Sequence, residues 1–158
     1  MSDSSKIIKK VDLTQVNESN FKLRYVGCLV LTQDHKILLQ QRGLNWNHFP
    51  GYLSEFGGRI EPNETPMHAL VRELNEELGA KVIESEVINL GAITEEATKH
   101  SELIHTYFWH DKLGTITGCY EGEAEYFDNL KSIFDCSSKI MDSVRWLLNQ
   151  CQHLQLLK

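Results

Sequence analysis

The chain lacks the features that mark several common classes of protein. Its cysteines lie far apart and form no CxxC pair: Cys28, Cys119, Cys136 and Cys151. A zinc knuckle is therefore not expected, nor is a disulfide framework. Residues 1–20 contain no long apolar run of a signal peptide, and no stretch approaches the ~18 apolar residues of a membrane span. We expect a cytoplasmic protein with no membrane partner, in which Cys28 and Cys151 are buried thiols.

Basic residues are scarce relative to acidic ones. Lys and Arg number 16 against 22 Asp and Glu, which gives a formal net charge of −6. Much of the acidic excess lies between Glu55 and Glu77. Non-specific binding to nucleic acid needs a basic surface, so no nucleic-acid polymer is expected as a partner. A small phosphorylated ligand is still compatible with this charge, because a bound divalent metal inverts the local field.

The remaining composition is that of one globular domain. The chain has 158 residues, of which 41% are hydrophobic and 24% charged, close to the average for folded domains. Residues 1–20 are polar and predict a flexible or edge segment ahead of a domain over residues 21–158. The sequence leaves the oligomeric state open, a homodimer included.

Apolar and β-branched runs predict strands on both sides of one central helix. The expected strands cover residues 21–32, 36–42, 52–56, 81–94, 103–112 and 124–127, with Gly57-Gly58 breaking the third. The expected helices cover residues 66–78, 128–134 and 140–148. This order indicates an α/β fold with a mixed sheet.

The central helix has clear start and stop signals. Thr65 can cap its first turn, Pro66 suits the first helical position, and Gly79 suits the residue that ends it. Aliphatic residues at helical spacing predict the buried face: Leu70, Leu74 and Leu78.

A neighbouring side of the same helix carries three carboxylates. Glu73, Glu76 and Glu77 follow the i, i+3, i+4 spacing that places side chains together. Like charges at this spacing repel by roughly 0.3 kcal/mol per pair on an exposed helix. Mg²⁺ and Mn²⁺ prefer oxygen ligands, so a bound cation would explain the cluster. Taken alone, however, the triplet is better explained as a solvated helix face.

The residues around the triplet form a longer fixed pattern. Gly58 is followed after five residues by Glu64, and after seven more by the run Arg72–Gly79, RELNEELG. This segment resembles the Nudix box, Gx5Ex7REUxEExGU, where U is a bulky aliphatic residue. Ala80 is the one departure, and it affects packing after the helix rather than any catalytic group. The box covers residues 58–80, and the order of strands extends a weaker resemblance to most of the chain.

The resemblance implies a Nudix-type α/β/α sandwich and a metal-dependent hydrolase acting on phosphoric anhydrides, MutT-like in kind. It implies Mg²⁺ or Mn²⁺ as the cofactor. The metal ligands it implies are the carbonyl of Gly57 and the carboxylates of Glu73, Glu76, Glu77 and Glu121. Glu64 and Arg72 would orient the ligating carboxylates, with Arg72 holding Glu64 or Glu73 by paired hydrogen bonds.

The general base has two candidates. Glu76 belongs to the box, and a carboxylate near the metal can accept the proton of the attacking water. Glu121, in the run Tyr-Glu-Gly-Glu, stands where MutT-like members often place a glutamate before a late strand, and Glu123 is the fallback. The alternative for Glu121 is a solvated turn residue.

The substrate is less well specified than the reaction. Arg42 ends a QQR run like that of MutT-like enzymes and, with Arg59, is a candidate for phosphate binding, although a structural role fits each equally well. The proline typical of ADP-ribose enzymes is missing around Glu95 and Glu96, and the diadenosine and NADH markers are absent. These absences favour a nucleoside triphosphate pyrophosphohydrolase. Nucleotide sugars, other dinucleotide-type substrates and a non-catalytic ligand-binding regulator are the alternatives.

Overall fold

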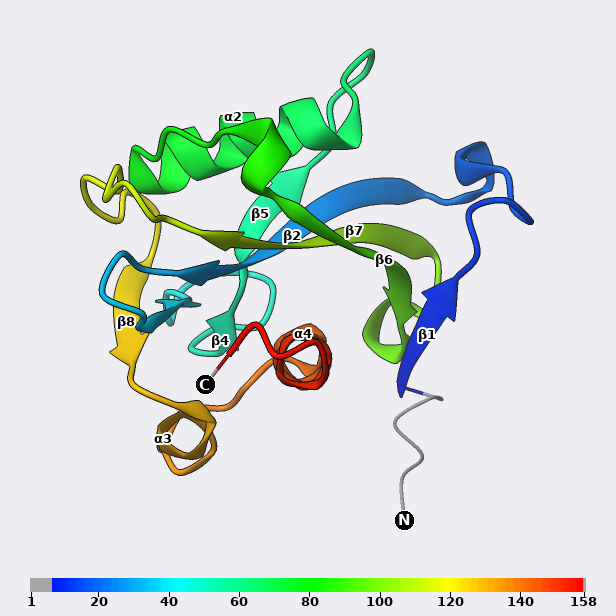
Figure 1. Cartoon of the computed structure of the whole chain (residues 1–158). Coiled ribbons are helices and arrows are strands. Elements are labelled where there is room, and N and C mark those ends of the chain that lie inside the picture. Colours follow the sequence, from blue (N-terminus) through cyan, green and yellow to red (C-terminus); the bar gives the residue numbers. More distant parts are fainter. Residues whose placement is uncertain (1–6, 158) are drawn as a thin grey trace.

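The computed structural model describes residues 7–157, which form three layers (Figure 1). A mixed sheet lies in the middle, α2 (Pro66–Leu78) covers one face, and α4 (Asp142–His153) with the short α3 (Leu130–Phe134) lies on the other. The strands are β1 (Ile8–Val11), β2 (Leu23–Leu31), β3 (Ile37–Gln41), β4 (Leu53–Ser54), β5 (Phe56–Arg59), β6 (Ile88–Glu95), β7 (Glu102–His110) and β8 (Glu123–Phe127). The predicted α/β sandwich with a mixed sheet is confirmed.

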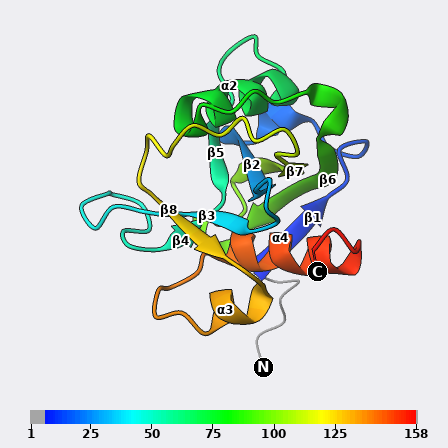
Figure 2. The ribbon, with the colours of Figure 1, turned by 60° about the vertical axis from the view of Figure 1, so that its left-hand side comes forward.

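Strand β2 is the centre of the sheet. The order is β1-β6-β7-β2-β3-β4, with β5 also paired to β2 and β8 to β3. Strands β2 and β7 run parallel, and the other named pairs are antiparallel. Figure 2 shows β3, β4 and β8 on the side of the molecule away from β1. Because β5 leads directly into α2, its pairing with β2 fixes where that helix starts.

Two of the strand predictions were wrong. The glycine pair does not break a strand, because Gly57 and Gly58 lie inside β5 and pair with β2. At Gly57 the backbone has φ +149°, and a Cβ would lie 2.0 Å from the carbonyl oxygen of Val26, so only glycine fits. The strand expected over residues 81–94 begins only at Ile88. Ahead of it, Lys81 donates its backbone N–H to the Thr115 hydroxyl instead of to a neighbouring strand.

Helix α2 begins and ends as predicted. The Thr65 hydroxyl accepts a hydrogen bond from the backbone N–H of His68, and Gly79 closes the helix with φ 65°. The expected buried face is confirmed, since its members are fully buried: Leu70, Leu74 and Leu78. The thiols of Cys28 and Cys151 are buried and free, as expected. Helix α4 starts two residues later than predicted and extends to His153.

The N-terminal segment is partly structured. Of the residues 1–20 described as polar, Ile8–Val11 form β1, which pairs with β6 at the edge of the sheet. Residues 1–6 lie outside the described part of the chain, as does Lys158. Within residues 7–157, no helix combines the length and the apolar character needed to cross a membrane.

Candidate active site

The box forms the turn from β5 into α2. Gly58 is the last glycine before this turn, and a Cβ there would lie 2.5 Å from the carboxyl carbon of Glu73. Glycine at this position therefore leaves the space that the Glu73 carboxylate occupies.

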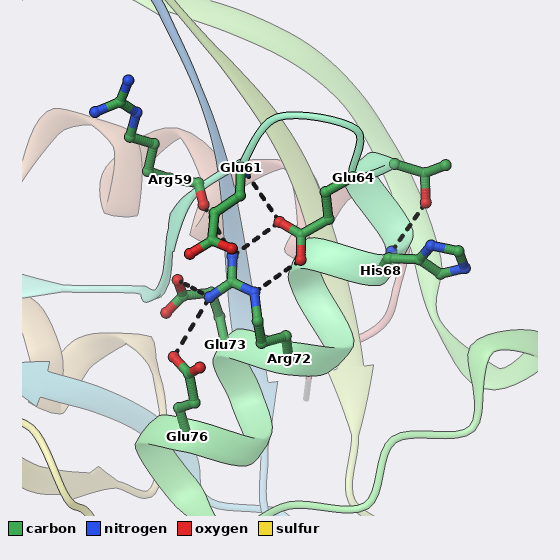
Figure 3. Close-up of polar contacts among 8 residues, drawn as sticks. Arg59, Glu61, Glu64, His68, Arg72, Glu73 and Glu76 are labelled. Carbon is green, nitrogen blue, oxygen red and sulfur yellow. Dashed lines mark hydrogen bonds and ion pairs between the residues drawn. The ribbon is translucent and has the colours of Figure 1, made fainter.

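Arg72 is the centre of the polar contacts in the box (Figure 3). Its Nε and Nη2 donate to the two carboxylate oxygens of Glu64 at 2.7 and 2.8 Å, which is the expected paired geometry. Its Nη1 donates to Glu73 at 2.8 Å and to Glu76 at 3.4 Å. Its Nη2 also donates to the backbone carbonyl of Arg59 at 3.0 Å. The guanidinium therefore ties together three acidic side chains and the end of β5.

The hydrogen bonds between Arg72 and Glu64 shift the pKa values of these two groups in opposite directions. The hydrogen bonds from Arg72 lower the pKa of the Glu64 carboxyl to about 2. The same bonds raise the pKa of the Arg72 guanidinium. Glu73 differs, because desolvation raises the pKa of its carboxyl in spite of the Arg72 hydrogen bond. Glu64 is thus a fully ionised partner of Arg72, whereas Glu73 carries a charge that its surroundings only partly compensate.

Glu77 is the most buried carboxylate of the box, with 3% of its surface exposed. Its Oε2 accepts a hydrogen bond from the backbone N–H of Gly57 at 3.0 Å. Burial, followed by repulsion from Glu121 and Glu73, raises the pKa of its carboxyl to about 9. Desolvation and neighbouring like charges disfavour the charged form of a carboxyl, and a bound cation favours it.

Glu121 reaches the same place from outside the box. The loop that carries it is fastened to α2 and β3 by two bonds: Tyr120 donates its N–H to the Glu77 carbonyl, and Gln40 Nε2 donates to the Glu121 carbonyl, both at 2.8 Å. The Glu121 carboxyl lies close enough to the Glu77 carboxyl to raise its pKa by charge repulsion. Sequence reasoning did not assign Gln40 this role of holding the loop, although it noted the QQR run. Ser54 in turn donates to Gln40 Oε1 at 3.1 Å.

A cleft of about 970 Å³ begins beside these carboxylates and extends to the turn between β6 and β7. Near the box it is lined by Gln40, Arg42, Gly57, Gly58, Glu77 and Glu121. Arg42 is held there by a hydrogen bond from its Nε to the His48 carbonyl at 2.9 Å, and it lies over the Trp46 ring at 4.7 Å. A guanidinium fixed at the mouth of an acidic cleft is placed to meet an anionic ligand.

Several residues predicted for the site do not line the cleft: Glu64, Arg72 and Glu73, which are joined to one another within the box, and Arg59, Glu76 and Glu123. Arg59 is exposed, and its guanidinium points away from the carboxylates (Figure 3); only its backbone carbonyl contacts Arg72. Glu76 is also exposed, with 59% of its side chain accessible, and its one polar contact among the described residues is the 3.4 Å approach to Arg72. Glu123 is exposed at the start of β8 and does not line the cleft either.

Sequence reasoning missed three further carboxylates in the cleft, Glu55, Glu95 and Glu102. Both oxygens of Glu55 accept from the Ser143 hydroxyl at 2.9 Å, and desolvation raises the pKa of the Glu55 carboxyl. Glu95 is buried at the end of β6, and burial followed by repulsion from Glu55 raises its pKa to about 7. The available signal was an acidic residue at the end of an apolar strand pattern, where charge is costly to bury.

The donor set of the box suits a hard divalent cation. It offers oxygens only, and the raised pKa of Glu77 reflects negative charge that a cation would stabilise. Within residues 7–157, no group of three or more Asp, Glu, His or Cys side chains already has the arrangement of a metal site. The Arg72 contacts explain this, since Glu73 and Glu76 turn toward the guanidinium. Binding a cation at the box would therefore require these carboxylates to reorient.

Comparison with known proteins gives a consistent family. Residues 22–137 match the family described as NUDIX domain. The chain is similar to a CTP pyrophosphohydrolase of Escherichia coli, 34% identical over 60% of this chain and 68% of that one. It is similar to an ADP-ribose pyrophosphatase of Methanocaldococcus jannaschii, 35% identical over 90% and 85%. It resembles the solution structure of the E. coli ORF135 protein, with TM-score 0.64 and 26% identity over 89% and 95%. The chain therefore belongs to the Nudix family and is a hydrolase acting on phosphoric anhydrides.

Proposed function

We propose that the protein is a nucleoside triphosphate pyrophosphohydrolase. The observation that carries this proposal is the meeting of Glu77, from the box, and Glu121, from outside it, at one end of a long cleft. Arg42 lines the same end of the cleft and can bind phosphate oxygens. The rest of the cleft is long enough to receive a nucleoside attached to those phosphates, since ligand sites commonly enclose ~300–1,000 Å³.

Members of the family generally use divalent metal ions, and we assign the Mg²⁺ or Mn²⁺ ligands to three carboxylates of the box together with Gly57 and Glu121. They are the carboxylates of Glu73, Glu76, Glu77 and Glu121 and the carbonyl of Gly57. When bound there, such a metal would neutralise phosphate charge and lower the pKa of a bound water. Arg72 and Glu64 have a different part. They hold Glu73 and the end of β5 in place, so the ligating side chains start from fixed positions.

The general base in this proposal is Glu121 rather than Glu76. A base needs to reach the proton of the attacking water within ~3 Å. The Glu121 residue lines the cleft and its carboxyl lies beside that of Glu77. Glu76 does not line the cleft, and its one polar contact among the described residues is with Arg72. The carbonyl of Glu121 is bound by Gln40, which keeps the proposed base over the box while substrates exchange.

A second candidate function is hydrolysis of ADP-ribose. It is favoured by one observation, the 35% identity to an ADP-ribose pyrophosphatase over 90% of this chain. Against it stands the missing proline near Glu95 and Glu96. The two candidates place the same diphosphate chemistry at the same box, so they differ only in what fills the far end of the cleft.

The deciding experiment is a substrate panel. Nucleoside triphosphates, oxidised nucleotides, ADP-ribose, nucleotide sugars and dinucleoside polyphosphates would be incubated with Mg²⁺ and with Mn²⁺. Chromatography would identify the products, because a nucleoside triphosphate cut at its inner linkage gives a monophosphate and pyrophosphate. The proposal requires the highest kcat/KM for a nucleoside triphosphate. A higher kcat/KM for ADP-ribose would transfer the assignment to the second candidate, and binding of any of these ligands without turnover would indicate a regulator.

A further inference from the structure

The end of the cleft away from the box is built around a carboxylate that the hydrolytic chemistry does not use. Glu95 lines the cleft, and only 7% of its surface is exposed. Among residues 7–157 its side chain has no hydrogen-bond or salt-bridge partner, although buried carboxylates normally have one. Desolvating a carboxyl without a partner is costly. Its presence therefore needs a reason beyond stability.

The strand register places Glu95 on a surface suited to a flat ligand. Side chains alternate between the faces of a sheet, so Glu95 shares the face of Ile93, which pairs with Ile104 on β7. On the neighbouring β2, Tyr25 pairs with Ile104 and therefore lies on the same face. Tyr25, Ile104 and Glu95 all line the cleft. The far end of the cleft thus has apolar and aromatic walls with an acidic group at its margin.

The backbone around Glu95 is held in one position. Its carbonyl accepts from the backbone N–H of His100 at 3.0 Å and from the Thr98 hydroxyl at 3.2 Å. The Thr94 hydroxyl is hydrogen-bonded to His100 Nδ1 at 2.8 Å, which is a further bond across the same turn. The backbone position of Glu95 is therefore fixed before a ligand arrives, which reduces the entropy lost on binding.

Glu95 has other acidic groups near it. Glu55, Asp142 and Glu102 are the carboxylates that act on Glu95, whereas the cations that line the same cleft are Lys22, Arg42 and Lys99. A ligand edge that presents a carbonyl oxygen to the Glu95 carboxylate would place two acceptors together. An edge that presents N–H groups would give Glu95 the hydrogen bonds it lacks.

Nucleobases differ in this property. Cytosine, adenine and guanine each carry an exocyclic amino group, and Glu or Asp is a known acceptor for the cytosine amino group. Uracil and thymine present a carbonyl oxygen where cytosine has its amino group. On the basis of the proposed function, we infer that Glu95 is a specificity-determining residue that accepts hydrogen bonds from the amino-bearing edge of the substrate's nucleobase and selects against uracil and thymine.

The test combines a variant with a ligand series. Glu95→Gln keeps the shape of the side chain but replaces one acceptor with a donor. Glu96→Gln is the matched control, because the neighbouring Glu96 undergoes the same chemical change but is exposed and does not line the cleft. Calorimetry would give Kd for CMP, AMP, GMP and UMP, and initial rates would give kcat/KM for the four triphosphates. Thermal unfolding would confirm that both variants are folded.

We expect the wild-type protein to bind the three amino-bearing monophosphates more tightly than UMP. Glu95→Gln should reduce that preference by roughly 10- to 100-fold, the equivalent of one hydrogen bond to a charged group, and it should act on KM more than on kcat. Glu96→Gln should leave the preference unchanged. The inference is overturned if the wild-type protein shows no preference for an amino-bearing base, or if Glu95→Gln weakens all four ligands equally.

The ligand series also separates this inference from the proposed function. Base preference in binding that depends on Glu95, together with no hydrolysis of any triphosphate, would support the inference and refute the proposed function. Hydrolysis of all four triphosphates at one rate by both wild type and Glu95→Gln would support the function and refute the inference. If Glu95→Gln does not fold, Glu95→Asp serves in its place, because it keeps the acceptor but shortens the side chain and should weaken CMP more than UMP.

Discussion

Glu64 and Glu77 belong to the same motif, yet their surroundings drive their carboxyl groups in opposite directions. Glu64 lies against Arg72, whose hydrogen bonds bring its pKa down to about 2. Glu77 is buried beside Glu121 and Glu73, and its pKa rises to about 9. The first carboxylate is compensated within the protein, whereas the second is compensated only if a cation arrives. The motif therefore contains an ion pair whose charges balance each other within the protein. Beside it lies the Glu77 carboxyl, whose charge no protein group balances among the described residues.

The largest effect is expected at Glu77. Glu77→Gln should remove more activity than the roughly 10- to 100-fold that loss of a supporting residue costs, because it removes charge proposed to bind the metal. In metal-free buffer the same variant should be more stable than wild type. A raised carboxyl pKa means that the group stabilises the fold fully below its ordinary pKa of 4.5, and that this stability is lost as the pH rises toward about 9.

The activity of wild type and Glu77→Gln is compared by kcat/KM with metal present. Their stability is compared by thermal unfolding in EDTA from pH 5 to 9. The stability gain of Glu77→Gln should grow with pH and reach the order of 1–3 kcal/mol near neutrality. A variant that keeps its turnover would remove Glu77 from the site. A variant less stable than wild type at pH 8 would show that the Glu77 charge is compensated without metal.

Glu121→Gln should lower kcat by roughly 10²- to 10⁴-fold if Glu121 is the general base, with little change in KM. It should also lower the pKa of Glu77, because Glu121 is the strongest source of charge repulsion on that carboxyl. Steady-state kinetics at several Mg²⁺ concentrations gives the first result. Glu123→Gln is the matched control, and equal losses in the two variants would argue against a specific role for Glu121.

Arg72→Lys tests the ion pair between Arg72 and Glu64. Lysine keeps the positive charge but loses the planar pair of bonds to Glu64 and the bonds to Glu73 and the Arg59 carbonyl. We expect activity to fall by roughly 10- to 100-fold with the fold retained. Kinetics and circular dichroism would measure both, and full activity in the lysine variant would mean that charge alone is sufficient.

The smallest effect is the pH dependence of the Glu64 contact. A lowered carboxyl pKa means that its stabilising effect is present above the ordinary value of 4.5 and is lost as the pH falls toward about 2. The difference in Tm between wild type and Glu64→Gln should therefore be constant above pH 5 and shrink between pH 4.5 and 2. A difference that persists unchanged at pH 2 would contradict the pairing with Arg72.

Local sequence signals predicted the elements that carry the box but not all of their neighbours. Thr65 and Gly79 mark the ends of α2 correctly, because capping depends on residues within one turn. The glycine pair of β5 was misread as a strand break, because its conformation depends on the approach of Val26 from another strand. The same limit explains Arg59, whose residue type suggested phosphate binding, while its side chain points away from the carboxylates of the box (Figure 3) and does not line the cleft.

The sequence alone determined the family pattern, the α/β class and the helix that bears Glu73, Glu76 and Glu77, since a periodicity of ~3.6 residues per turn decides which side chains share a face. Tertiary structure decided which of those carboxylates is buried and what meets it. Glu77 is desolvated by β5 and faced by Glu121, which follows it by more than forty positions in the chain. Desolvation and charge repulsion depend on distances in space, and a local sequence pattern does not show which distant loop lies beside the helix.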